Sequence, residues 1–112
     1  MLNRQIVIYT ASRLLELYEG TQRICSYPVA VGKGSTPTPP GHYTIATKME
    51  YPGGAFGSRW LGLSIPHYGI HGTNNPSSIG QAVSKGCIRM YNHDVEYLYQ
   101  IVEIGTLVTI QR

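Results

Sequence analysis

The first part of the chain alternates apolar and polar residues in short runs, which is the pattern of β-strands. Residues 5–10, 13–18 and 22–31 are rich in β-branched, leucine and aromatic side chains, and only short turns separate them. We expect two or three antiparallel strands here, because short connections join antiparallel neighbours. Residues 32–41 hold three prolines and three glycines, so this stretch is expected to be a loop.

The remaining pattern continues with short strands and contains one convincing helix. We expect strands at 42–49, 59–65, 68–72 and 106–110, a single helical turn within 74–80, and a helix at 92–102.

The helix is indicated by an apolar face and by signals at both ends. Val95, Leu98 and Ile101 recur at helical spacing. Asn92 is a suitable N-cap, and Gly105 lies just past the end. The whole pattern predicts a single domain, residues 1–112, that is mostly β with one packed α-helix near the C-terminus.

Charge and composition argue against nucleic acid and membrane as partners. The net charge is +3, but the nine lysines and arginines are spread singly, whereas nucleic-acid-binding surfaces cluster them. No apolar run approaches the ~20 residues of a membrane span. We therefore expect no nucleic-acid partner and no transmembrane segment.

Two cysteines, Cys25 and Cys87, lie 62 positions apart and form no CxxC pair, so a disulfide framework is not indicated. Cys87 has two interpretations: a small buried hydrophobe, or a reactive thiol with a cation nearby. If residues 87–90 are extended, Cys87 and Arg89 share one face, where the guanidinium favours the thiolate. The backbone N–H groups of Gly86 and Cys87 are candidates for an oxyanion hole.

A nucleophilic cysteine needs a base, and His71 is the candidate. It stands at the end of an expected strand, and the nearby carbonyl of Gly72 is a candidate to orient its ring. The other interpretation is a hydrogen-bonded core histidine. His67 and His71 have the i, i+4 spacing of helical zinc ligands, but four residues of strand span ~13 Å, so we expect no metal and no other cofactor.

The Gly-rich segment 50–58 carries Tyr51 and Phe56, and Trp60 follows it. It is open to two interpretations, a solvated hairpin loop or a mobile aromatic flap over a cleft.

Together, "IHGTNNPSSIGQAVSKGCIRM" resembles the catalytic segment of the L,D-transpeptidases of the YkuD family, a His-Gly followed after a loop by Ser-x-Gly-Cys-(Ile/Val)-Arg. "VAVGKGSTPTPPGHYTI" resembles the family's Val-Gly and Thr-Pro-x-Gly strand region, and "IVIYTASRLLELYEGTQRICSYPVAVG" resembles its first hairpin. The resemblance covers essentially the whole chain.

The resemblance implies a β-sandwich-like catalytic domain that cross-links peptidoglycan stem peptides, donor and acceptor, through a thioester on cysteine. It implies Cys87 as nucleophile, His71 as base and the Gly72 carbonyl as its orienting group, with Gly86 in the oxyanion hole. Substrate-binding residues are expected to be Ser84, Arg89, Tyr51, Phe56 and Trp60. Carbapenem-type β-lactams are expected inhibitors.

One position departs from the common family pattern: Lys85 stands where many members have a histidine. The site is expected to be intact, because the family's base corresponds to His71. Two alternatives stay open. The same Cys/His pair would serve an L,D-carboxypeptidase, in which water replaces the acceptor amine, and the fold would also serve a non-catalytic wall-binding or spore-structural domain.

The resemblance implies a location in the cell wall or outside the cytoplasmic membrane. The opening "MLNRQIVIYTASRLLEL" does not have the form of a signal peptide, since polar residues interrupt its apolar stretch. A spore-associated location and an export segment outside this chain are both left open.

Overall fold

The computed structural model describes residues 3–112 and is mostly β, with one α-helix near the C-terminus. The strands are β1 Arg4–Tyr9, β2 Leu14–Glu19, β3 Gln22–Pro28, β4 Val31–Gly32, β5 Gly41–Glu50, β6 Arg59–Leu63, β7 Gly69–His71, β8 Ala82–Ser84, β9 Ile88–Arg89 and β10 Leu107–Gln111; the helices are α1 Asn92–Ile101 and the 3-10 turns η1 Gly54–Phe56 and η2 Pro76–Ser78. The predicted fold class is confirmed. The run 22–31 divides into β3 and β4, and β8 was not predicted.

The first half of the sheet follows directly from the alternation in the sequence. Strands β1, β2 and β3 pair antiparallel, which places Ile6 opposite Leu17 and Ile8 opposite Leu15, all fully buried. The last strand, β10, pairs parallel to β1, so the C-terminal end of the chain completes the core beside the first strand.

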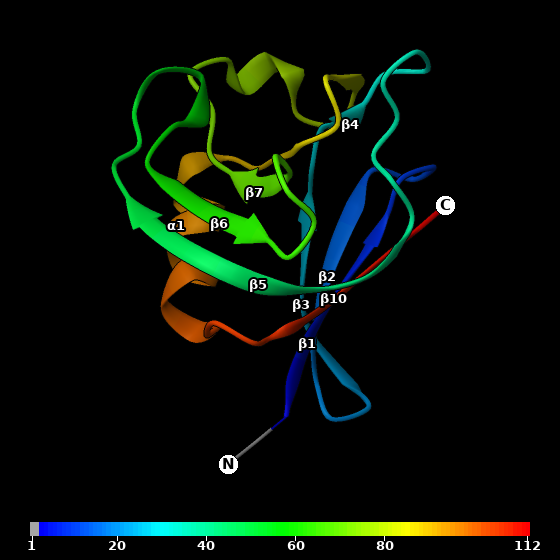
Figure 1. Cartoon of the computed structure of the whole chain (residues 1–112), viewed down its shortest axis with the longest axis vertical. Coiled ribbons are helices and arrows are strands. Elements are labelled where there is room, and N and C mark those ends of the chain that lie inside the picture. The colour runs from blue at the N-terminus through cyan, green and yellow to red at the C-terminus, as the bar shows by residue number, and fades with distance from the viewer. Residues whose placement is uncertain (1–2) are drawn as a thin grey trace.

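Strand β5 joins the two halves of the sheet. Its first part pairs with β10 and its second part with β6, and the register shifts between Ile45 and Thr47. Eight strands thereby form one sheet in the order β3-β2-β1-β10-β5-β6-β7-β9, and β4 pairs with β8 separately. The sheet bends along β5, so that β6 and β7 run at an angle to β1 and β2 (Figure 1), and both halves contribute side chains to one core.

Helix α1 lies behind β5 and β6 in Figure 1 and closes the core. Val95 and Leu98 are fully buried, as the helical spacing predicted. The Lys48 ammonium donates to the carbonyls of Tyr99 and Val102, which satisfies carbonyls at the end of the helix.

The start of α1 differs from the prediction. Tyr91, not Asn92, is the N-cap, and no side chain caps the first turn. The Asn92 side chain turns instead towards the segments that contain Ser58 and Thr73.

The strands β6, β7 and β9 present two different faces. Leu61, Ile70 and Ile88 are paired with one another across these strands and are buried in the core. The next row, Trp60, His71 and Arg89, must lie on the opposite face, because successive side chains of a strand alternate. Among residues 3–112, no helix has the length and apolar character needed to cross a bilayer.

Candidate active site

The candidate site lies on the outer face of β7 and β9, where parallel pairing brings distant residues together. His71 is opposite Arg89 in the register of the two strands. Cys87 directly precedes β9 and stands two residues before Arg89, so its side chain lies on the same face. The Cys87 Sγ is hydrogen-bonded to the carbonyl of His67, 3.6 Å away. The structure therefore groups three of the predicted site residues.

The environment of His71 fixes both its ring plane and its tautomer. The imidazole is only 3% exposed; it stacks on Trp60 with 5.6 Å between ring centroids and meets the edge of Phe56 at 5.0 Å. Its Nδ1 lies 2.5 Å from the Gly72 carbonyl oxygen. Because a carbonyl oxygen only accepts hydrogen bonds, Nδ1 carries the proton and Nε2 keeps its lone pair.

Burial lowers the pKa of His71 to about 4; the hydrogen bond to Gly72 raises this pKa and the charge of Arg89 lowers it further. The imidazole is therefore neutral at physiological pH. It is able to accept a proton, as a general base must.

Burial also raises the pKa of the Cys87 thiol, against the backbone hydrogen bond from Gly69 and the charge of Arg89, which both lower it. The Arg89 charge lowers the thiol pKa, as predicted, but burial is the larger influence. At rest the Cys87 thiol and the His71 imidazole are thus both neutral. A preformed thiolate–imidazolium pair is not what this geometry favours.

The turn before the nucleophile is closed by Ser84. Its hydroxyl accepts from the Gly86 N–H at 3.0 Å and donates to the Cys87 carbonyl at 2.7 Å, and the residue is 2% exposed. In this structure the Gly86 N–H, predicted as an oxyanion donor, is bonded to Ser84. The Ser84 hydroxyl, predicted to bind substrate, uses its donor proton and one acceptor site within the turn.

Gly86 is needed for another reason. It has a φ of +123° and Tyr68 packs against it so closely that a Cβ would overlap the ring. Within residues 3–112, the Cys87 N–H has no protein acceptor, which leaves it as the available backbone donor of this turn.

The Pro-rich loop 33–40 is hydrogen-bonded to the same turn through two threonine side chains. Thr38 is buried and donates its hydroxyl to the Gly86 carbonyl at 2.8 Å, and Thr36 donates to the Ser84 carbonyl at 2.9 Å. The C=O and N–H of a trans peptide point in opposite directions. By holding the Gly86 carbonyl, Thr38 also sets the direction of the Cys87 N–H.

The aromatic residues in and next to the 50–58 loop lie in two different places. Phe56 and Trp60, with Met49 and Pro52, line an apolar pocket of about 310 Å³ beside His71. Tyr51 is 73% exposed, and its ring lies on the Arg59 guanidinium instead. The structure thus brings Phe56 and Trp60 to the site but not Tyr51.

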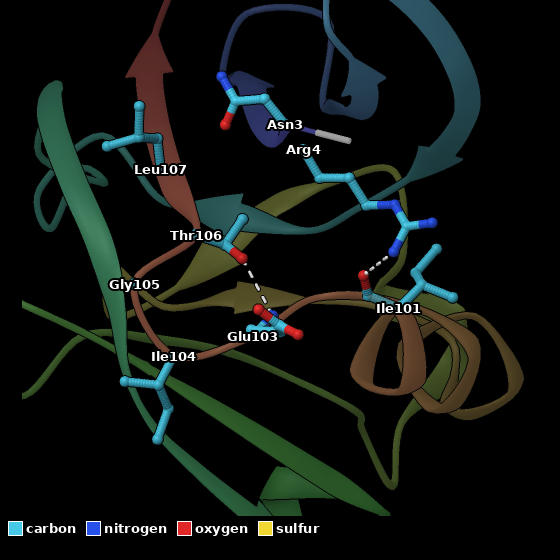
Figure 2. A pocket seen from close by; sticks show the side chains of 8 residues that line it. All are labelled: Asn3, Arg4, Ile101, Glu103, Ile104, Gly105, Thr106 and Leu107. Atoms are coloured by element: carbon cyan, nitrogen blue, oxygen red, sulfur yellow. Dashed lines mark hydrogen bonds between the residues drawn. The ribbon is translucent and has the colours of Figure 1, made fainter. Parts of the chain in front are cut away.

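A second pocket of about 280 Å³ lies elsewhere, between the start of β1 and the end of α1 (Figure 2). Its Arg4 is bonded to the Ile101 carbonyl and pairs with Glu19. None of its eight lining residues is a cysteine or a histidine, so it offers neither nucleophile nor base. Within residues 3–112, no three His, Cys, Asp or Glu side chains converge as metal ligands would.

Sequence reasoning missed Thr36, Thr38 and the true contacts of Asn92. Each acts on backbone groups 19 to 48 positions away in the chain, so no local spacing reveals the contact. The available signal was indirect: Thr36 and Thr38 lie in a Pro-rich loop without regular structure, and polar side chains in loops often bond to backbone groups.

We expect loss of the Arg89 charge to raise the pKa of both Cys87 and His71, because that charge lowers the pKa of each. In Arg89→Gln, on a Cys25→Ala background, the pH midpoint of thiol alkylation should move upward. NMR titration should place the His71 midpoint above its wild-type value. Midpoints that stay in place would mean that Arg89 does not act electrostatically on the pair.

The buried imidazole should also make stability depend on pH. The pKa of His71 is about 4 when folded, against 6.5 ordinarily, so the unfolded chain binds a proton first as pH falls. The contribution is complete above pH 6.5 and disappears towards pH 4, and its size is on the order of 3 kcal/mol. Urea unfolding of wild type and His71→Gln should show a difference in unfolding free energy that shrinks across this range. A difference independent of pH would contradict the assignment.

Comparison with known proteins agrees with this arrangement. The L,D-transpeptidase catalytic-domain family YkuD matches residues 3–110. The L,D-transpeptidase YkuD of Bacillus licheniformis is 55% identical over 106 residues, which cover 95% of this chain and 64% of that protein. The chain therefore spans less than two thirds of the length of this relative.

Solved structures share the fold. The catalytic domain of an Enterococcus faecium L,D-transpeptidase, at 23% identity, superposes with a TM-score of 0.82 over 98% of each chain. L,D-transpeptidase 3 of Mycobacterium tuberculosis, solved with a faropenem-derived adduct, gives 0.87 at 18% identity, over 99% of this chain and 61% of its own. With the family match over almost the full length, these findings show that the chain belongs to the YkuD family of L,D-transpeptidase catalytic domains.

Proposed function

We propose that this chain is a cysteine-dependent L,D-transpeptidase domain that acts on peptidoglycan stem peptides through a thioester at Cys87. The observation that carries the proposal is one shared strand face with a thiol, a cation and a neutral histidine of fixed tautomer. Family membership supports the reaction class.

The first half-reaction follows from the resting protonation states. The Cys87 thiol leaves the His67 carbonyl, gives its proton to His71 Nε2, and attacks the carbonyl of the diamino acid at stem position 3. The Cys87 N–H stabilises the oxyanion. The tetrahedral intermediate then collapses, the bond to the terminal D-Ala breaks, and His71 returns the proton to the departing amine. The product is a thioester and a neutral imidazole.

The second half-reaction uses the same groups in the opposite order. The amine of an acceptor stem attacks the thioester, His71 takes a proton from that nitrogen, and the thiolate leaves and is reprotonated. Water as the attacking group would give hydrolysis instead. The stacked Trp60 and the Phe56 edge beside His71 help to keep water from the base.

The distribution of charge favours an anionic substrate. Between residues 20 and 93 the chain has six lysines and arginines but one acidic residue, Glu50. Arg89 has no carboxylate partner among the described residues. Stem peptides carry several carboxylates, which this surface attracts. Since peptidoglycan lies outside the cytoplasmic membrane, we propose that the domain works there.

The proposal predicts a covalent adduct at one thiol. Other L,D-transpeptidases have been solved with a faropenem-derived adduct and with imipenem, so imipenem is a suitable probe. Intact mass spectrometry should find one added acyl group in wild type and Cys25→Ala, and none in Cys87→Ala. An adduct on Cys25, or no adduct at all, would end the proposal.

A stem tetrapeptide then separates transfer from hydrolysis. Cross-linked dimers are the expected product of the purified protein, whereas trimmed monomers alone would assign it as an L,D-carboxypeptidase. An inert protein that retains its fold would be a wall-binding or structural domain.

The base is expected to be His71 and not Lys85. General-base catalysis contributes about 10²–10⁴-fold, so His71→Gln should slow single-turnover acylation on that scale. A lysine acts as a base when burial removes its charge, and Lys85 is exposed. Lys85→Ala should therefore cost far less, and Lys85→His should be tolerated. Equal damage from Lys85→Ala and His71→Gln would show that the base is misassigned.

A further inference from the structure

Asn92, the first residue of α1, connects three separate segments through its side-chain amide. Its Oδ1 accepts from the backbone N–H of Ser58 and from that of Thr73, each at 3.1 Å. Its Nδ2 donates to the Thr73 carbonyl, also at 3.1 Å. Asn92 itself follows Cys87 by five residues, so one amide joins the nucleophile segment, the histidine segment and the end of the 50–58 loop.

The bond to Thr73 acts on the peptide group that orients the histidine. The Thr73 N–H and the Gly72 C=O belong to the same planar peptide unit. One end of this unit accepts from His71 Nδ1 and the other end donates to Asn92 Oδ1. Hydrogen bonds at both ends of an amide polarise it and strengthen each other. Asn92 therefore fixes the plane of the peptide and makes the Gly72 oxygen a better acceptor.

The surrounding sequence leaves room for this amide on two sides. A Cβ on Gly57 or on Gly72 would overlap the Asn92 Oδ1. Gly57 also has a φ of +66°, which suits glycine. The position of the amide is thus defined by packing as well as by its three hydrogen bonds.

The contact with Ser58 ties the aromatic loop to the same point. Ser58 is where the 50–58 loop returns to β6, and Phe56 of that loop rests edge-on against the His71 ring. The loop therefore contacts the His71 ring directly through Phe56, and it is linked to the Gly72–Thr73 peptide through Ser58 and Asn92.

We propose that Asn92 is a positioning residue, which holds His71 in its Nδ1–H tautomer through the Gly72–Thr73 peptide and couples that state to the 50–58 loop. The catalytic importance of this inference rests on the function proposed above. The effect on the tautomer does not, and it is measured separately.

The test compares Asn92→Ala with Asn74→Ala, a matched control in the adjacent loop that is exposed and makes no hydrogen bond within residues 3–112. Nitrogen-15 NMR of the His71 ring should show a single Nδ1–H tautomer in wild type and Asn74→Ala, and a mixture in Asn92→Ala. Acylation by imipenem should slow by up to about 100-fold in Asn92→Ala, as a small misplacement of a catalytic group does, with the apparent imipenem affinity unchanged.

A second variant keeps the inference falsifiable if Asn92→Ala does not fold. Asn92→Ser removes the Oδ1 acceptor and the Nδ2 donor but keeps a small polar side chain at the start of the helix, and it should produce the same tautomer mixture. An unchanged tautomer and an unchanged acylation rate in either folded variant would overturn the inference. If wild type is not acylated by imipenem, the proposed function fails, while the NMR comparison still decides the role of Asn92.

Discussion

The hydrogen bond from His71 Nδ1 to the Gly72 carbonyl is the interaction on which the site depends. No carboxylate lies near His71 in the sequence, so a neutral backbone dipole takes the place that a charged partner holds in many triads. A carbonyl orients the ring and fixes its tautomer without stabilising the imidazolium as strongly as a carboxylate would. Burial between Trp60 and Phe56 therefore outweighs this hydrogen bond and lowers the pKa of His71 to about 4.

Two peptide groups border the candidate site, Gly86–Cys87 and Gly72–Thr73. Each is hydrogen-bonded to a side chain of another segment. Thr38 holds the carbonyl end of the Gly86–Cys87 peptide, and Asn92 holds the N–H end of the Gly72–Thr73 peptide. The strands provide the rigid frame, but the final direction of an N–H or a C=O in a connecting turn is not set by the sheet. Side-chain hydrogen bonds from the Pro-rich loop and from α1 fix the direction of these N–H and C=O groups.

Much of the fold was predictable because its signals are local. Alternation gave the strands, and the spacing of Val95 and Leu98 gave the helix and its buried face. The pairing of β1 with β10 and of β7 with β9 is parallel and long-range, so no turn between neighbours reveals it. In the site, the thiol, the histidine and its carbonyl were identifiable from residue type. The hydroxyl of Ser84 and the amide of Asn92 were not, because each residue type has several possible partners and only the folded chain selects one.

The neutral state of the Cys87 thiol has a consequence for the durability of the protein. Peroxides oxidise the thiolate rather than the thiol, and a cysteine with a raised pKa forms sulfenic acid slowly. Burial raises the pKa of Cys87, so the resting sulfur is expected to react slowly with peroxides. An exposed low-pKa cysteine would start catalysis more readily, but it would also be oxidised readily in surroundings without a reducing thiol pool. The same desolvation that requires a base in the proposed mechanism would therefore protect the proposed nucleophile between turnovers.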